Sequence, residues 1–436
     1  MSVTTHRGYW WLPGLPDDVA AGQLVVDDDT GRCHLELVGS LDLRTAAVLE
    51  NFGDEDAKAI EQERVHVVHG RVRGKPVTLL NCYAGAADGV VHGGRSFMDI
   101  VVQEALLGAH VEHEEPAFRY AIVEIENLTG WLGIDDVITR DRDEDGEKAV
   151  VGRADDLTAE VNGWRIVARR VPKPFQVGRS HARATVGGSI DGFLVLHPTE
   201  PRPLRDFHGV VLKIMDLLTL ASGRPCGQIA LTLIHRDDEV VRDRDGSRFV
   251  IDTRVESFGG RIHTARPEEA SPRDWDFLFR RADLPFEQLV PAWIQLRRAT
   301  ADACNVFFGL RYARPTFTEA RLLLVSTVAQ ALHAGLRGPE AVTYRTRLIE
   351  LSQIPDAEAV HSVITDVETW SKDLLRARNS LAHTGNDDAR SDIFELEWVT
   401  SSLLSLVFMA ELGLPADVQR RAASTVLPLP WSRTRT

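Results

Sequence analysis

The segment LLRARNSLAHTG, residues 374–385, holds an arginine and a histidine whose spacing could support chemistry on an anion. Arg378 offers a permanently charged, planar guanidinium that suits phosphate oxygens. His383 has a reference pKa of about 6.5, so its imidazole can accept or release a proton near neutral pH. Asn379 adds an amide beside the cation. The pattern Arg-Asn-x-x-x-His therefore raises the hypothesis of an active site.

An amphipathic helix is predicted to position these residues. It begins near Asp356, which follows Pro355 and is a predicted N-cap, and Gly385 is its predicted stop. Arg378 falls on the apolar stripe, so its side chain starts from the face that should be buried. Five residues correspond to about 140° of rotation, so Arg378 and His383 share a side of the helix only loosely. The stripe comprises Val360, Val363, Ile364, Val367, Trp370, Leu374, Leu375 and Leu381.

Arg378 and His383 could each have a structural role instead of a catalytic one. An arginine on an apolar stripe is commonly paired with a glutamate from a neighbouring helix. A histidine in a last turn commonly complements the helix dipole. Spacing alone therefore does not decide between a catalytic and a structural pair.

The periodicity of the sequence changes near residue 280. Up to about residue 260, short stretches rich in Val, Ile, Leu and Thr alternate with turn sequences such as Arg73-Gly74 and Asn162-Gly163, which predicts antiparallel hairpins. One helix is predicted at about residues 203–221. From about residue 283, apolar residues recur with the period of an α-helix. The sequence therefore predicts an α+β protein, with an antiparallel β-rich domain at residues 1–280 and an all-α domain at residues 281–436.

Composition and charge limit the classes of function. The 436 residues are 44% hydrophobic, and their net charge of −14 argues against a protein that coats nucleic acid. Residues 281–436 carry 17 basic and 18 acidic side chains, so residues 1–280 carry a net charge of −13. The N-terminus resembles no leader peptide, and no apolar run approaches the length of a membrane span. We expect a cytoplasmic protein without a membrane association.

Metal and cofactor sites are not expected. The four cysteines lie far apart without the spacing of a zinc site. His110, His113, Glu114 and Glu115 could contribute metal ligands if they were helical, but no further partner is evident. Residues 141–152 resemble the first half of a calcium loop, yet Gly152 occupies the position of the required glutamate, so a solvated hairpin is the better interpretation.

Two resemblances give the motif a context. Arg378-Asn379-Ser380-Leu381-Ala382-His383, preceded by Arg376 at the end of a long helix, resembles the Arg-Asn-x-x-x-His signature of HEPN ribonucleases. The N-terminal stretch GYWWLPGLPDDVAAGQLVVDDDTGRCHLELVGSL is similar to the N-terminal domain of ApeA-like proteins, which carry a C-terminal HEPN domain. The two resemblances together extend over most of the chain.

The resemblance implies a regulated, metal-independent endoribonuclease of abortive-infection anti-phage defence. Arg378, Asn379 and His383 would be catalytic, and Arg376 would be a weaker RNA-binding residue. The substrate would be RNA, the active form would be a homodimer or larger homo-oligomer joined through C-terminal helices, and a phage-derived protein would trigger it. Residues 1–280 would form the sensor or regulatory domain, and residues 281–436 the HEPN bundle. The alternative is a non-enzymatic HEPN-like scaffold for dimerisation or binding, in which Arg378 and His383 are structural.

Overall fold

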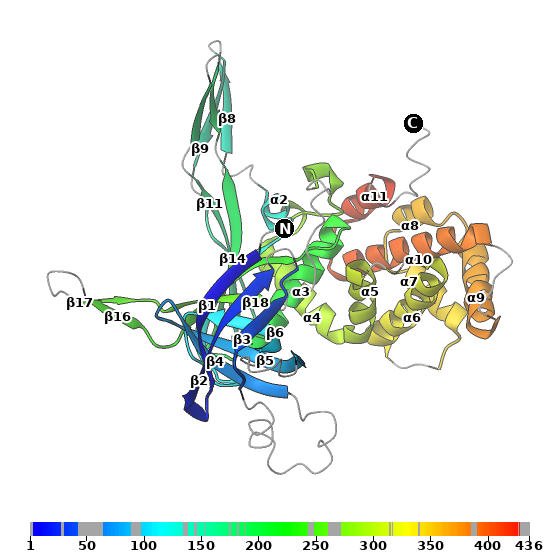
Figure 1. The fold of residues 1–436 in the computed structure, drawn as a ribbon. Helices are drawn as coiled ribbons and strands as arrows, with labels where there is room; N and C mark the ends of the chain where they lie inside the picture. Colours follow the sequence, from blue (N-terminus) through cyan, green and yellow to red (C-terminus); the bar gives the residue numbers. More distant parts are fainter. Residues whose placement is uncertain are drawn as a thin grey trace.

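The computed structural model describes most of the chain. The described residues are 3–27, 30–41, 64–88, 97–133, 138–143, 146–152, 154–173, 176–180, 183–187, 189–242, 248–259, 272–313, 315, 317–338, 341–384, 390–425 and 427. They form an antiparallel β region followed by a helical region, which lie side by side in Figure 1. The α+β prediction is confirmed.

The first strands form a closed antiparallel sheet. Strand β6 pairs with both β3 and β5, which closes the order β6-β3-β2-β1-β4-β5. Alternate side chains point inward, as in β3, where Cys33, Leu35 and Leu37 are buried, and they surround the fully buried Trp10. The strands are β1 (Val3–Leu12), β2 (Leu15–Asp27), β3 (Cys33–Val38), β4 (Arg64–Val72), β5 (Lys75–Asp88) and β6 (Phe97–Leu107).

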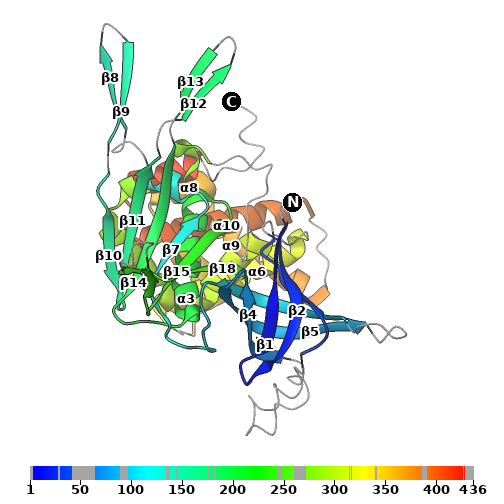
Figure 2. The same cartoon turned by 60° about the vertical axis from the view of Figure 1, so that its left-hand side comes forward.

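Strand β6 also continues into a second antiparallel sheet, of order β6-β18-β15-β7-β14-β11-β10. Figure 2 shows the closed sheet beside this second sheet, with two hairpins, β8–β9 and β12–β13, projecting from it. The further strands are β7 (Phe118–Ile125), β8 (Ile138–Asp143), β9 (Gly146–Val151), β10 (Leu157–Val161), β11 (Trp164–Pro172), β12 (Gln176–Ser180), β13 (Arg183–Gly187), β14 (Ile190–Pro198), β15 (Gln228–His235), β16 (Glu239–Arg242), β17 (Arg248–Ile251) and β18 (Arg254–Gly259).

Predicted turns lie where the sequence placed them. Arg73 and Gly74 have φ angles of 49° and 83° between β4 and β5, and Asn162 and Gly163 have 51° and 77° between β10 and β11. Successive residues with positive φ are the requirement of the tight hairpin turn that matches the twist of the strands. The calcium-like stretch is the hairpin β8–β9, in which Asp143 pairs with Gly146, as predicted.

The helical region follows two short 3₁₀ turns, η1 (Asp274–Asp276) and η2 (Arg281–Asp283). Helix α3 lies between the second sheet and the helical region in Figure 1. The helical pattern of residues 285–310 is divided into two helices at Thr300, whose hydroxyl donates to the carbonyl of Leu296. The helices are α2 (Leu128–Leu132), α3 (Leu204–Ser222), α4 (Phe286–Ala299), α5 (Ala301–Ala313), α6 (Thr318–Arg337), α7 (Tyr344–Ser352), α8 (Ala357–Val363), α9 (Val367–Thr384), α10 (Arg390–Glu411) and α11 (Ala416–Thr425).

The main hydrophobic core is continuous across residue 280. It includes residues of α3 as well as of α4 and α5, such as Leu217, Trp293 and Phe307. The indole of Trp293 donates to the carbonyl of Lys213 at 2.6 Å. A cut at residue 280 would therefore expose an apolar face of α4, so the two regions share their packing.

A buried polar cluster joins α3 to α4 and α5. The Asp216 carboxylate accepts from Arg297 Nε at 2.8 Å and from the Tyr312 hydroxyl at 2.8 Å. Arg297 also donates to Asn305 Oδ1 at 2.7 Å. Burial raises the pKa of Asp216 to about 6, and the neighbouring Arg297 opposes this rise. The cluster fixes how α3 meets the helical region.

Helix α10 contains the stretch Ile393–Glu411, which is long and apolar enough to cross a membrane by composition alone. Of this stretch, 67% is buried inside the structure, which is the pattern of a core helix. It is the one such stretch among the described residues.

Candidate active site

Helix α9, which carries the Arg-Asn-x-x-x-His motif, begins later than predicted. The predicted N-cap Asp356 is confirmed, since its carboxylate accepts the N–H of Ala359 at 3.1 Å, but the helix it starts is the short α8. The prediction of one helix from Asp356 to the motif is wrong. Ile364 is extended, and Asp366 starts a new helix by accepting the N–H of Thr369 at 3.1 Å. The sequence Asp366-x-x-Thr369 was the overlooked capping signal.

The packing of α9 is that of an amphipathic helix. Trp370, Leu374 and Leu381 are buried, as the apolar stripe predicted, and Ala377 is buried with them. The Trp370 indole donates to Thr400 Oγ1 of α10 at 3.2 Å. Contacts with α6, α7 and α10 hold the helix from one side.

Arg378 lies half-buried at the margin of this packed face. Its guanidinium carbon is 4.6 Å from the centre of the Tyr344 ring, which begins α7. Its Nη2 is 3.5 Å from Oε1 of Gln330 on α6. Within the described parts of the chain, no carboxylate forms an ion pair with Arg378, so the expected structural alternative of an Arg–Glu pair is not found there. The cation is held by an aromatic face and an amide, and its charge stays available to an anion.

Tyr344, like Gln330, is a residue of this site that sequence reasoning missed. Its hydroxyl donates to the carbonyl of Ser326 on α6 at 3.1 Å, which fixes the ring beneath Arg378. Burial raises the pKa of Tyr344, so the phenol stays neutral. No pattern in the sequence links Tyr344 with Arg378, because only the packing of α7 against α9 brings them together.

The remaining motif residues lie on the exposed side of α9 or in its last turn. Asn379 is exposed on α9. Arg376 is 79% exposed and pairs with Asp373 at 3.1 Å, the solvated arrangement expected of the weaker candidate. His383 lies in the last turn of α9, as predicted, but its side chain lies outside the described residues, as does Gly385. The approach of His383 to Arg378 stays a prediction.

Two family models match the chain. The model described as ApeA N-terminal domain 1 matches residues 5–293, which is more than half of the chain. The model described as Apea-like HEPN matches residues 327–418. The chain belongs to the ApeA family. No curated protein and no solved structure matches it.

The HEPN match of this ApeA-family chain contains the whole of α9 and therefore Arg376, Arg378, Asn379 and His383. It also contains Tyr344 and Gln330, which hold Arg378. The ApeA N-terminal match ends within α4, thirteen residues beyond residue 280. Helix α9 lies at the end of the helical region that is remote from the strands (Figure 1).

The histidine and glutamate cluster considered for metal binding is not helical in the ApeA N-terminal region. His110 Nε2 lies 2.8 Å from the carbonyl of Gly70, and its ring stacks on that of His69 at 4.4 Å. Glu115 accepts from Arg236 at 2.6 Å, and Glu114 pairs with Arg205. Among the described residues, no group of three or more His, Cys, Asp or Glu side chains is placed to hold a metal ion.

Proposed function

We propose that this ApeA-family chain is a regulated, metal-independent endoribonuclease that acts in abortive-infection defence against phage. The observation that carries the proposal is the Arg-Asn-x-x-x-His motif on α9, within the stretch matched by the Apea-like HEPN model. The half-buried Arg378, held by Tyr344 and Gln330, is suited to the role because its charge is not neutralised by a described carboxylate. Residues 1–280 would be the sensor and residues 281–436 the catalytic part.

The reaction we propose uses the 2′-hydroxyl of RNA as the nucleophile. His383 accepts the 2′-hydroxyl proton or donates a proton to the leaving 5′-oxygen, since one imidazole cannot do both at once. Arg378 stabilises the charge that builds up on the phosphorus oxygens. Asn379 orients the imidazole or a phosphate oxygen, and Arg376 adds a weak contact to the RNA. The products would be a 2′,3′-cyclic phosphate and a 5′-hydroxyl.

Purified full-length protein is expected to cleave total RNA to the same extent with and without EDTA, because the proposed chemistry assigns no role to a metal ion. The measurement is gel analysis of RNA with mapping of the new ends, with and without phage-infected lysate as the source of a trigger. Inhibition by EDTA that added Mg²⁺ restores would contradict the metal-independent mechanism.

We also propose that the active form is a homodimer in which two copies of the motif face one cleft. One Arg–His pair supplies only part of the acid, base and charge stabilisation that cleavage needs. Light scattering at micromolar concentration is expected to give at least twice the mass of one chain, 48.4 kDa. A monomer that cleaves RNA at full rate would contradict this proposal.

Regulation by residues 1–280 would have to act through the helical region rather than by covering α9. Helix α9 contacts α6, α7 and α10 and lies away from the strands (Figure 1). Helix α4 packs against strand β10 and against α3, where Trp293 donates to Lys213, and this packing connects the two regions directly. We propose that a phage-derived protein binds residues 1–280 in the cytoplasm and shifts the arrangement of the paired HEPN motifs through this connection.

A non-enzymatic scaffold remains the second candidate function. The observation that favours it is the stacking of Arg378 on Tyr344, which is also a suitable structural role for the cation. The two candidates make opposite predictions for the RNA-cleaving activity of an Arg378 variant.

A further inference from the structure

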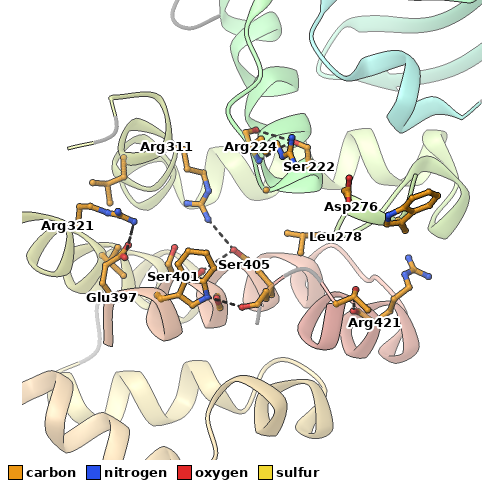
Figure 3. A pocket seen from close by; sticks show the side chains of 18 residues that line it. Ser222, Arg224, Asp276, Leu278, Arg311, Arg321, Glu397, Ser401, Ser405 and Arg421 are labelled. Carbon is orange, nitrogen blue, oxygen red and sulfur yellow. Dashed lines mark hydrogen bonds and ion pairs between the residues drawn. The ribbon is translucent and has the colours of Figure 1, made fainter. Parts of the chain in front are cut away.

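A cavity of about 660 Å³ lies at the junction of the β region and the helical region. Figure 3 shows it between the C-terminal end of α3, with Ser222 and Arg224, and α10, with Ser401 and Ser405. Arg311 of α5 and Arg321 of α6 enter from one side. A volume of this size is in the range of pockets that hold small organic ligands. It lies apart from the motif of α9, whose residues do not line it.

Positive charge is concentrated around this cavity in a chain whose net charge is −14. Its lining includes four arginines, Arg224, Arg311, Arg321 and Arg421, and two carboxylates, Asp276 and Glu397. Two of the arginines are already neutralised. Arg321 donates to both oxygens of Glu397 at 2.9 Å, and Arg421 donates to Asp283 at 2.9 Å.

Arg311 forms no ion pair in the described part of the chain, and Glu397, whose charge acts on it, is already paired with Arg321. It donates to the carbonyl of Phe307 at 3.2 Å and to the Ser405 hydroxyl at 3.3 Å, and its guanidinium carbon is 3.6 Å from the centre of the Phe307 ring. Burial lowers its pKa to about 10, so the group remains charged at neutral pH. An anion that reaches a fixed, poorly solvated guanidinium interacts with it more strongly than with a fully solvated one.

The other walls of the cavity are apolar and aromatic. Leu278, Leu310 and Val325 contribute aliphatic surface. Trp275 also lines the cavity and is 68% exposed. Trp398 adds a second indole, fixed by a hydrogen bond of 2.9 Å from its Nε1 to the carbonyl of Leu427. Arg273 lies over the Trp275 ring at 5.4 Å, and the Phe394 ring is stacked near Trp398 at 6.1 Å. Nucleobases stack on the indole faces that such neighbours leave open.

We propose that this cavity binds a nucleoside phosphate, with a phosphate at Arg311 and the base on the aromatic wall. The bound nucleotide would contact Ser222 and Arg224 within the ApeA N-terminal match and Ser401 and Ser405 within the HEPN match, so it would bridge the two regions. On α10, Thr400 lies between the lining residues Trp398 and Ser401 and accepts from Trp370 of α9. The proposal concerns binding and goes beyond RNA cleavage, since it does not require that α9 be catalytic.

The test is isothermal titration of the full-length protein with GDP and with ADP, using guanosine, adenosine and inorganic pyrophosphate as comparison probes. At least one diphosphate is expected to bind more tightly than its nucleoside and than pyrophosphate. Arg311→Gln is expected to weaken that binding by about 10- to 100-fold, the usual value of a hydrogen bond to a charged group. Ser401→Trp, which fills the cavity and keeps every arginine, is expected to abolish it. Arg337→Gln, an exposed position of α6, is the matched control and is expected to bind as the wild type does.

Arg378→Gln separates this cavity from the proposed RNA site and is expected to keep full binding. Circular dichroism melts show whether each variant is folded, and Ser401→Trp decides the question if Arg311→Gln does not fold. Failure of both diphosphates to bind at millimolar concentration would overturn the proposal. Equal binding by wild type and Ser401→Trp, or loss of binding in Arg378→Gln alone, would place the nucleotide elsewhere and overturn it too. Equal affinity for pyrophosphate would overturn the assignment to a nucleoside phosphate.

Discussion

Replacing Arg378 by alanine is expected to lower the rate of RNA cleavage by about a hundredfold or more, while the protein stays folded. The guanidinium is the charged group proposed to stabilise the phosphorus oxygens in the transition state. The fold should tolerate its loss because Arg378 is only half-buried, Tyr344 keeps its hydrogen bond to Ser326, and Gln330 is exposed. The measurement is initial cleavage rate together with the thermal melt.

Other variants of α9 serve as controls and comparisons for this test. Lys372→Ala removes an exposed cation of α9 away from the motif and is expected to keep the wild-type rate. Arg378→Lys keeps the charge but loses the planar fork, so its rate should lie between those of the wild type and the alanine variant. His383→Ala should also abolish cleavage. A folded Arg378→Ala protein that cleaves at the wild-type rate would rule out the proposed mechanism and favour the scaffold.

Replacing Arg297 by alanine is expected to lower the free energy of unfolding by about 3–5 kcal/mol. The substitution leaves the carboxylate of Asp216, whose side chain is 1% exposed, with Tyr312 as its remaining described hydrogen-bond donor. An uncompensated charge at this depth is costly, and it lies where α3 meets α4 and α5. The measurement is urea unfolding followed by circular dichroism.

Arg298→Ala provides the control for this second prediction, because Arg298 is the next residue of α4 and is exposed. Its free energy of unfolding should stay within about 0.5 kcal/mol of the wild type. The double variant Asp216→Leu with Arg297→Met should recover much of the lost stability, since a buried ion pair can be replaced by apolar side chains of similar size. Equal unfolding free energies for Arg297→Ala and Arg298→Ala would show that the cluster does not stabilise the junction.

Local sequence patterns determined the type and approximate position of the elements. Alternation with period two marked the strands, as in β3, and the period of the α-helix marked the helices beyond residue 283. Arg73-Gly74 and Asn162-Gly163 were predictable as turns because positive φ is a property of individual residues. The helical motif around Arg378 and the buried stripe of α9 followed from the same local information.

Contacts between distant segments were decided only by the tertiary structure. The break at Ile364–Asp366 falls within a continuous apolar stripe, so periodicity alone did not reveal it, although Asp366 was a capping residue. Arg378 meets Gln330 across 48 residues, and Arg297 meets Asp216 across 81 residues.

The arrangement of the sheets and of the cavity was also decided only by the tertiary structure. The pairing of β6 with β3, β5 and β18 closes one sheet and joins it to the next. The cavity draws its walls from segments between Ser222 and Leu427. Helix and turn preferences act over a few residues, whereas such pairings depend on which apolar faces pack together once all the elements are present.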